Sequence, residues 1–177
     1  MTETTCPSLI ELGIKPGSFI RKLDKQTHWN AFTDYEDLSV AALEVATRVF
    51  CEKGEIYSLW QVDTEQEFYG VVASLTANAN PKDRNIDFIW MSGSELESAG
   101  ISLENVPEGD CIRVKDLHFD VVITQQSAKH LCYDLLSQQR IAYRCKKAQT
   151  KLILQYQQNL GCKAADENSE LCNCEAE

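Results

Sequence analysis

The order in which helix-type and strand-type apolar patterns follow one another constrains the fold of this chain more than any other feature. Residues 34–53 repeat apolar side chains every three or four positions, as one face of a helix does. Thr33 and Glu36 have the spacing of a capping box at the start of this pattern. Segments rich in β-branched and aromatic residues lie at 18–23, 55–62, 67–75 and 86–91. Strand-type segments that gather after one helix, without regular alternation of the two types, indicate an α+β fold.

We predict a mostly antiparallel sheet of five or six strands, packed by the helix in the N-terminal half and by a long C-terminal helix. The short polar link Asp63–Gln66 predicts a hairpin between the second and third strand-type segments. The C-terminal helix is predicted from a second helix-type pattern over 127–160. Ser137–Gln139 interrupts its apolar stripe, so the pattern fits either one long helix or two shorter ones.

Residues 111–123 cannot form one regular strand with a single buried face. Their apolar residues switch from even to odd positions: Ile112 and Val114, then Leu117, Phe119, Val121 and Ile123. Side chains alternate between the two faces of a strand, so one of these sets would face water. A bulge or tight turn at Lys115-Asp116 would bring both sets into the core.

The 177 residues are predicted to form one α+β domain over 17–160. Residues 1–16 are expected to be a loose N-terminal arm, and residues 161–177 a disordered, acidic, cysteine-containing tail. The first residues lack the basic and apolar regions of a secretion signal, and no apolar run approaches the about 20 residues of a membrane span. Together with a net charge of −10, these features predict a cytoplasmic protein that does not bind membranes.

A charge inversion precedes the tail. Six Lys or Arg residues and no Asp or Glu lie between Arg140 and Lys163, in a chain with 17 basic and 27 acidic residues. On a continuous helix, four of the cations would form one stripe opposite the apolar face: Arg140, Arg144, Lys147 and Lys151. Such a stripe is either an ordinary solvated surface or a contact for an acidic partner.

The first functional hypothesis is therefore a non-enzymatic binding or regulatory protein that contacts an acidic protein surface through a basic C-terminal helix. A weak nucleic-acid binder is an alternative, although four cations without interleaved aromatic residues make a small phosphate footprint. The heptad positions of 127–160 would also allow a homodimer through the same helix. Gln138, Gln149 and Asn159 occupy core-type positions of that seam and weaken it.

Asp116, His118 and Asp120 are the residues best placed for chemistry. In an extended segment these alternate residues share one face, and two carboxylates beside an imidazole could hold a proton or offer ligands to a metal. They give the alternative of a small enzyme or metal-binding protein. The same alternation is also that of a half-buried strand with a wet outer face.

The tail offers a weaker metal candidate, because the thiolates of Cys162, Cys172 and Cys174 could bind a soft metal. Their spacing differs from the paired C-x₂₋₄-C of zinc sites, and free thiols in a disordered tail are the alternative. The chain has no P-loop, dinucleotide-binding, zinc-protease or nucleophile-elbow motif. No cofactor is therefore expected, and the enzyme hypothesis is the weaker one.

Overall fold

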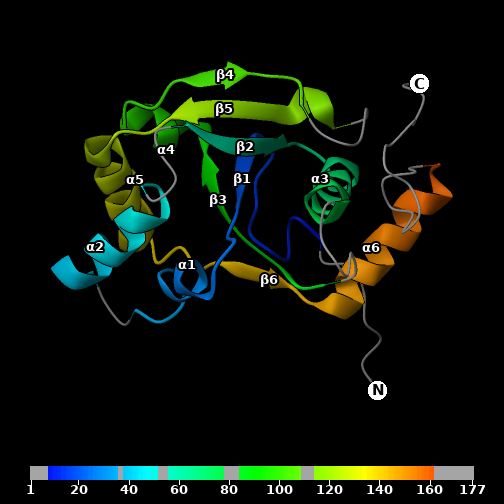
Figure 1. Cartoon of the computed structure of the whole chain (residues 1–177), viewed down its shortest axis with the longest axis horizontal. Coiled ribbons are helices and arrows are strands. Elements are labelled where there is room, and N and C mark those ends of the chain that lie inside the picture. Colours follow the sequence, from blue (N-terminus) through cyan, green and yellow to red (C-terminus); the bar gives the residue numbers. More distant parts are fainter. Residues whose placement is uncertain (1–7, 36–37, 52–55, 78–83, 109–113, 162–177) are drawn as a thin grey trace.

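The computed structural model describes residues 8–35, 38–51, 56–77, 84–108 and 114–161 (Figure 1). Within these ranges the chain forms six α-helices, one 3₁₀ helix (η1) and six strands. In chain order they are β1 (Ser18–Lys22), α1 (Gln26–Asn30), α2 (Val40–Val49), β2 (Ile56–Val62), α3 (Glu65–Ala77), β3 (Ile86–Ser92), α4 (Gly93–Ser98), β4 (Leu103–Asn105), η1 (Lys115–Leu117), β5 (His118–Val122), α5 (Gln125–Ser137), β6 (Tyr143–Cys145) and α6 (Lys147–Asn159). The predicted α+β class is confirmed.

The strands of the described residues form one antiparallel sheet in the order β4-β5-β2-β1-β3-β6. β1 is central, and its Ile20 pairs with Trp60 on β2 and with Trp90 on β3. The edge strands β4 and β6 have only three residues each. Short edges limit the backbone that another chain could pair with. The predicted antiparallel sheet of five or six strands is confirmed.

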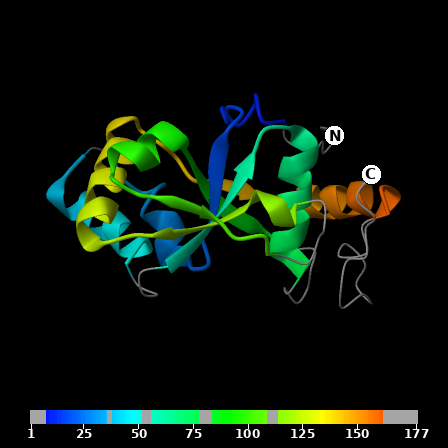
Figure 2. The same cartoon turned by 90° about the horizontal axis from the view of Figure 1, so that it is seen from above.

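Helices cover both faces of the sheet. Because side chains alternate along a strand, Phe19 enters one core, called the first core, and Ile20 enters the other, called the second core. The first core receives residues of α2, α4 and α5, and the second receives residues of α3 and α6. Both views place α2 and α5 toward one end of the sheet and α3 and α6 toward the other (Figure 1, Figure 2).

The prediction of a strand at 67–75 is wrong, because this segment lies within α3. The helix starts with a reciprocal cap: Thr64 Oγ1 accepts a hydrogen bond from the N–H of Glu67, and Glu67 Oε2 accepts one from the N–H of Thr64. Phe68 and Val71 are fully buried at helical spacing. The link that suggested a hairpin is therefore a helix N-terminus, and β1 lies between β2 and β3.

The first long helix is shorter than the pattern over 34–53 and has a different cap. Ser39 caps α2, because its Oγ accepts a hydrogen bond from a backbone N–H of the first turn. Thr33 instead donates its hydroxyl to the carbonyl of Trp29, in the turn that follows α1. The predicted capping box also required Glu36, which lies outside the described residues.

Of the two alternatives for the pattern over 127–160, the structure shows two shorter helices, with β6 between them, in place of one long C-terminal helix. Gln139 follows α5 with a φ of 53°, the left-handed conformation common just after a helix. The N–H of Arg140 then donates to the carbonyl of Leu135. The polar residues that interrupted the apolar stripe are thus the place where the chain leaves the helix.

The tight turn predicted at Lys115-Asp116 is confirmed. η1 lies there, and it separates Val114, which is buried in the second core, from Val121, which is buried in the first. Ile112 lies outside the described residues. The apolar residues before β5, Val114 and Leu117, thus pack on the second core, and those of β5, Phe119 and Val121, on the first.

Part of the predicted N-terminal arm packs against the sheet. Leu9, Leu12 and Ile14 are buried in the second core. Residues 1–7 of the arm, and the predicted tail after Gly161, lie outside the described residues. None of the described helices combines the length and the apolar character that a membrane crossing requires.

Candidate binding surfaces

Arg140 lies in the turn between α5 and β6 and is bound by the protein itself. Its guanidinium donates to the carbonyl oxygen of Trp90 at 2.7 Å and to Glu95 Oε1 at 2.9 Å. Its Cζ lies 5.5 Å from the centroid of the Trp90 ring. Glu95 is buried and also belongs to the capping box of α4. Arg140 therefore links the C-terminal segment to β3 and α4.

Arg144 on β6 is bound in a similar way. Its Nε and Nη2 donate to the two carboxylate oxygens of Asp87 on β3, at 2.7 and 2.6 Å. Its Cζ lies 4.4 Å from the centroid of the Trp29 ring. The hydrogen bonds to Asp87 raise the pKa of Arg144. A planar guanidinium suits this combination of a two-pronged carboxylate contact and ring stacking.

The predicted stripe of four cations on one helix does not form. Arg140 lies in a turn and Arg144 on a strand, so only Lys147 and Lys151 lie on α6. The helical spacing that placed the four residues together does not apply across the break at Gln139 and β6. Both arginines are instead part of the internal packing.

The heptad seam predicted for a homodimer through the C-terminal helix is occupied within the protein. Ala128, Leu131 and Leu135 have no exposed surface, and Ala142 and Cys145 are buried beyond the break. These side chains fill the two cores of the same chain. A coiled coil through them would require the cores to unpack.

Lys146, Lys147 and Lys151 form an exposed cationic surface at the start of α6, here called the lysine face. The first turn of α6 contains no acidic residue. Its N–H groups are capped by neutral amide oxygens: the N–H of Lys146 donates to Gln149 Oε1, and that of Lys147 to Asn85 Oδ1. The cap therefore supplies no carboxylate to balance the lysines.

Asp116, His118 and Asp120 do not share one open face. Asp116 is exposed in η1, whereas His118 and Asp120 lie on β5. His118 is only 3% exposed, and its ring lies 4.8 Å from that of Trp60. Trp60 belongs to the second core, so the strand face expected to be wet is covered at His118.

His118 and Asp120 are the two members of this group that the fold brings together. His118 Nδ1 lies 2.7 Å from the carbonyl oxygen of Val106, which places the proton of a neutral ring on Nδ1. Its Nε2 lies 3.8 Å from Asp120 Oδ1, which also accepts a 3.5 Å hydrogen bond from the Ser58 hydroxyl. Asp116 takes no part in this contact.

The structure describes some of the cysteines and leaves the tail cysteines outside the described residues. Cys162, Cys172 and Cys174, the metal candidates of the tail, lie outside the described residues. Among the residues that the structure describes, no three His, Cys, Asp or Glu side chains form a group that could hold a metal ion. Cys132 is a buried free thiol, and its burial raises its pKa. Cys51 is an exposed free thiol, and partial burial raises its pKa as well.

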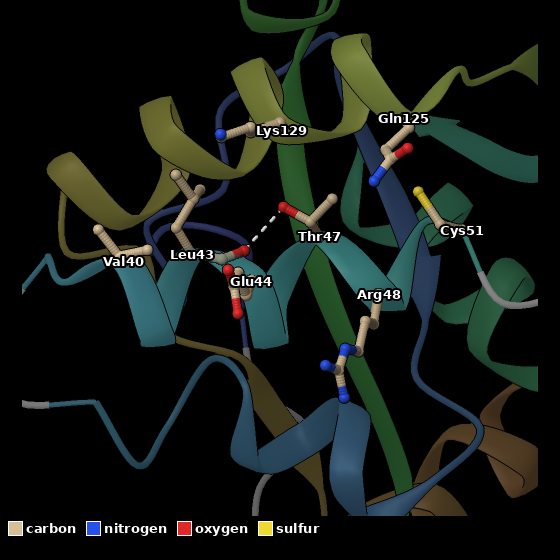
Figure 3. Close-up of a pocket in the computed structure, with 8 residues that line it drawn as sticks. All are labelled: Val40, Leu43, Glu44, Thr47, Arg48, Cys51, Gln125 and Lys129. Atoms are coloured by element: carbon tan, nitrogen blue, oxygen red, sulfur yellow. Dashed lines mark hydrogen bonds between the residues drawn. The ribbon is translucent and has the colours of Figure 1, made fainter.

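The sequence did not predict a hollow between α2 and α5 (Figure 3). Its volume is about 440 Å³. Apolar Val40 and Leu43 line it together with the charged side chains of Glu44, Arg48 and Lys129. In Figure 3 Leu43 points toward α5, whereas Arg48 points away from it. The hollow is thus an apolar groove with charges at its margin.

The pattern over 34–53 predicted a helix, but it was interpreted as one apolar face and not checked for exposed residues. Val40 is 76% exposed and Val45 is 45% exposed, whereas Ala46 and Val49 are buried. At 100° per residue, Val40 lies about 180° from Val49 around the helix. Helical spacing alone could therefore have shown that Val40 points away from the core.

Comparisons with protein-family models, with curated proteins and with solved structures find no significant match to this chain.

Proposed function

We propose that this chain is a non-enzymatic cytoplasmic binding protein whose lysine face holds an acidic surface of a protein partner. The observation that carries the proposal is the position of Lys146 and Lys147 at the N-terminal end of α6. The aligned peptide dipoles make that end of a helix partly positive, so Asp or Glu is favoured there and each cation costs about 0.3–1 kcal/mol. The lysines are thus placed where they oppose the stability of the helix.

An acidic partner would offset this cost. Lys147 and Lys151 lie four residues apart on α6 and repel each other as like charges on neighbouring turns. Carboxylates placed opposite the lysine face would relieve this repulsion and the repulsion by the helix dipole together. The same charges would also steer an acidic partner toward this end of an otherwise acidic protein.

A protein partner fits the lysine face better than nucleic acid does. Three lysines neutralise few phosphates, and the net charge of −10 repels a polyanion from the rest of the surface. A local cluster of carboxylates requires only the lysine face itself. For the cytoplasmic setting, support comes from Cys132, which is buried as a free thiol.

Binding of poly-L-glutamate, followed by isothermal calorimetry at low salt, tests the proposal with a defined probe. The variant Lys146→Gln/Lys147→Gln/Lys151→Gln is expected to lose this binding. The variant Lys15→Gln/Lys25→Gln/Lys129→Gln has the same change in net charge at exposed lysines elsewhere and is the matched control. Cross-linking in cell extract with the same three proteins then identifies partners that depend on the lysine face.

Equal binding by the two triple variants would refute the proposal, because net charge alone would then explain the interaction. Undiminished binding by the lysine-face variant would also refute it. Salt should weaken binding of the wild-type protein, since exposed charges are screened beyond a Debye length of about 8 Å at physiological ionic strength.

A further inference from the structure

Helix α2 is a ridge between two hollows. The first is the hollow between α2 and α5. The second, of about 450 Å³, lies on the other side of α2 and is lined by Tyr35, Ala41 and Val45, among others. Val40 and Val45 are exposed at the two margins of this ridge, about 140° apart around the helix, with Glu44 and Arg48 between them. Each valine lines one of the two hollows. Exposed apolar residues beside hollows mark surfaces that bind other proteins.

We infer that the outer side of α2 is a two-fold symmetric interface with a second copy of this chain. This surface, here called the α2 face, consists of Val40, Ala41, Glu44, Val45 and Arg48, and all five residues are exposed. A ridge beside a hollow is complementary to itself, because a two-fold rotation places the ridge of each copy over a hollow of the other. The apolar residues of both ridges would then leave water together.

The charges around the α2 face are also self-complementary. Two copies of a chain with a net charge of −10 repel each other over most of their surfaces. Among the residues that the structure describes, however, the charged ones that line the two hollows are two acids and two cations: Asp34, Glu44, Arg48 and Lys129. Here two copies can approach without net repulsion.

The positions of Glu44 and Arg48 fix the register of the dimer. They lie one turn apart on α2, about 40° from each other around the helix. When two copies of α2 pack antiparallel about an axis midway between these residues, Glu44 of each copy lies beside Arg48 of the other. The interface would thus contain the same ion pair twice, as two-fold symmetry requires.

The α2 face and the lysine face lie on different parts of the molecule. Helices α2 and α6 are at opposite ends of the sheet in both views (Figure 1, Figure 2). Dimerisation through α2 would therefore leave both lysine faces open and place two of them on one particle. The dimer does not depend on the proposed acidic partner, and either inference can fail alone.

Analytical ultracentrifugation of the full chain from about 1 µM to about 1 mM tests the dimer. The wild-type protein is expected to shift from monomer to dimer, and Val45→Asp is expected to remain monomeric. Because Val45 is already exposed, circular dichroism and the melting temperature should hardly change. Ile10→Asp is the matched control, since Ile10 is 89% exposed in the N-terminal segment and should leave the dimer intact.

Charge reversal tests the register. Glu44→Arg and Arg48→Glu should each raise the dimer Kd about tenfold or more, because like charges then meet twice across the axis. The double variant Glu44→Arg/Arg48→Glu should restore the wild-type Kd. A monomeric wild-type protein at the highest concentration would overturn the inference. So would a dimer that survives Val45→Asp, or single reversals that the double variant fails to rescue.

Discussion

The arginines and the lysines of one basic segment have opposite environments. Arg140 and Arg144 each bind an internal carboxylate and lie beside an indole ring. Lys147 and Lys151 are exposed on a helix whose first turn has no acidic residue. The planar guanidinium makes paired hydrogen bonds and stacks, whereas the ammonium group is compact and strongly hydrated. In this protein the type of cation, more than its place in the sequence, separates the charges that are partly buried beside a carboxylate and a ring from those that are exposed on a helix.

The largest effect should come from Arg140→Ala. The change leaves the buried Glu95 without its cation and the Trp90 carbonyl without a donor, and we expect the free energy of unfolding to fall by about 3 kcal/mol. Urea denaturation measures it. Adding Glu95→Gln should recover part of the loss, because Gln can keep the α4 cap without a buried charge. If Lys151→Ala costs as much as Arg140→Ala, the contrast between the two cations is wrong.

A smaller loss is expected for Arg144→Lys. Lysine keeps the charge but cannot contact both Asp87 oxygens or stack on Trp29 in the same way. The free energy of unfolding should therefore fall by about 1–2 kcal/mol. The reciprocal change Lys147→Arg, measured in the same denaturation series, should have almost no effect. Equal changes in the free energy of unfolding for the two variants would show that the two hydrogen bonds from Arg144 to Asp87 do not contribute to stability.

High pH should destabilise the protein through the buried thiol of Cys132. Burial raises the pKa of Cys132 on α5, so the folded protein keeps a proton that the unfolded chain loses from about pH 8.5 upward. The free energy of unfolding should then fall as pH rises, by up to about 1.4 kcal/mol per pH unit. Denaturation curves between about pH 7.5 and about pH 10 should show a shallower fall for Cys132→Ala. A slope for Cys132→Ala equal to that of the wild-type protein would show that this thiol does not cause the effect.

The smallest expected effect has the opposite sign. Replacing Lys146, Lys147 and Lys151 by Gln removes cations from the positive end of α6 and should raise the free energy of unfolding by about 0.5–1 kcal/mol. The control substitution Lys15→Gln, at an exposed lysine outside the described helices, should leave it nearly unchanged in the same denaturation assay. A loss of stability in the lysine-face variant would remove the physical basis of the proposed function.

Local sequence patterns predicted those elements in which the order of apolar residues within the segment decides which side is buried. The sheet class and the turn at Lys115-Asp116 came from alternation along single segments. The run at 67–75 was ambiguous, because a short apolar segment with β-branched and aromatic residues fits a buried strand or a buried helix. Only the cap between Thr64 and Glu67 distinguishes the two.

The candidate site was less predictable, because its arginines find partners far away in the sequence. Arg140 binds Glu95 across 45 residues, and Arg144 binds Asp87 across 57. No local pattern contains such pairs. The hollow between α2 and α5 likewise depends on how the two helices pack together, which the spacing of residues within α2 does not show.

The central position of β1 bears on how the protein folds. The first strand of the chain lies between β2 and β3, and β3 gains its second neighbour only when β6 arrives near the C-terminus. Sheets built from such distant pairings fold slowly, in roughly milliseconds to seconds. During synthesis, a chain that has not yet reached Cys145 would leave β3 with an open edge. This unfinished edge is where a growing chain would be most exposed to pairing with another.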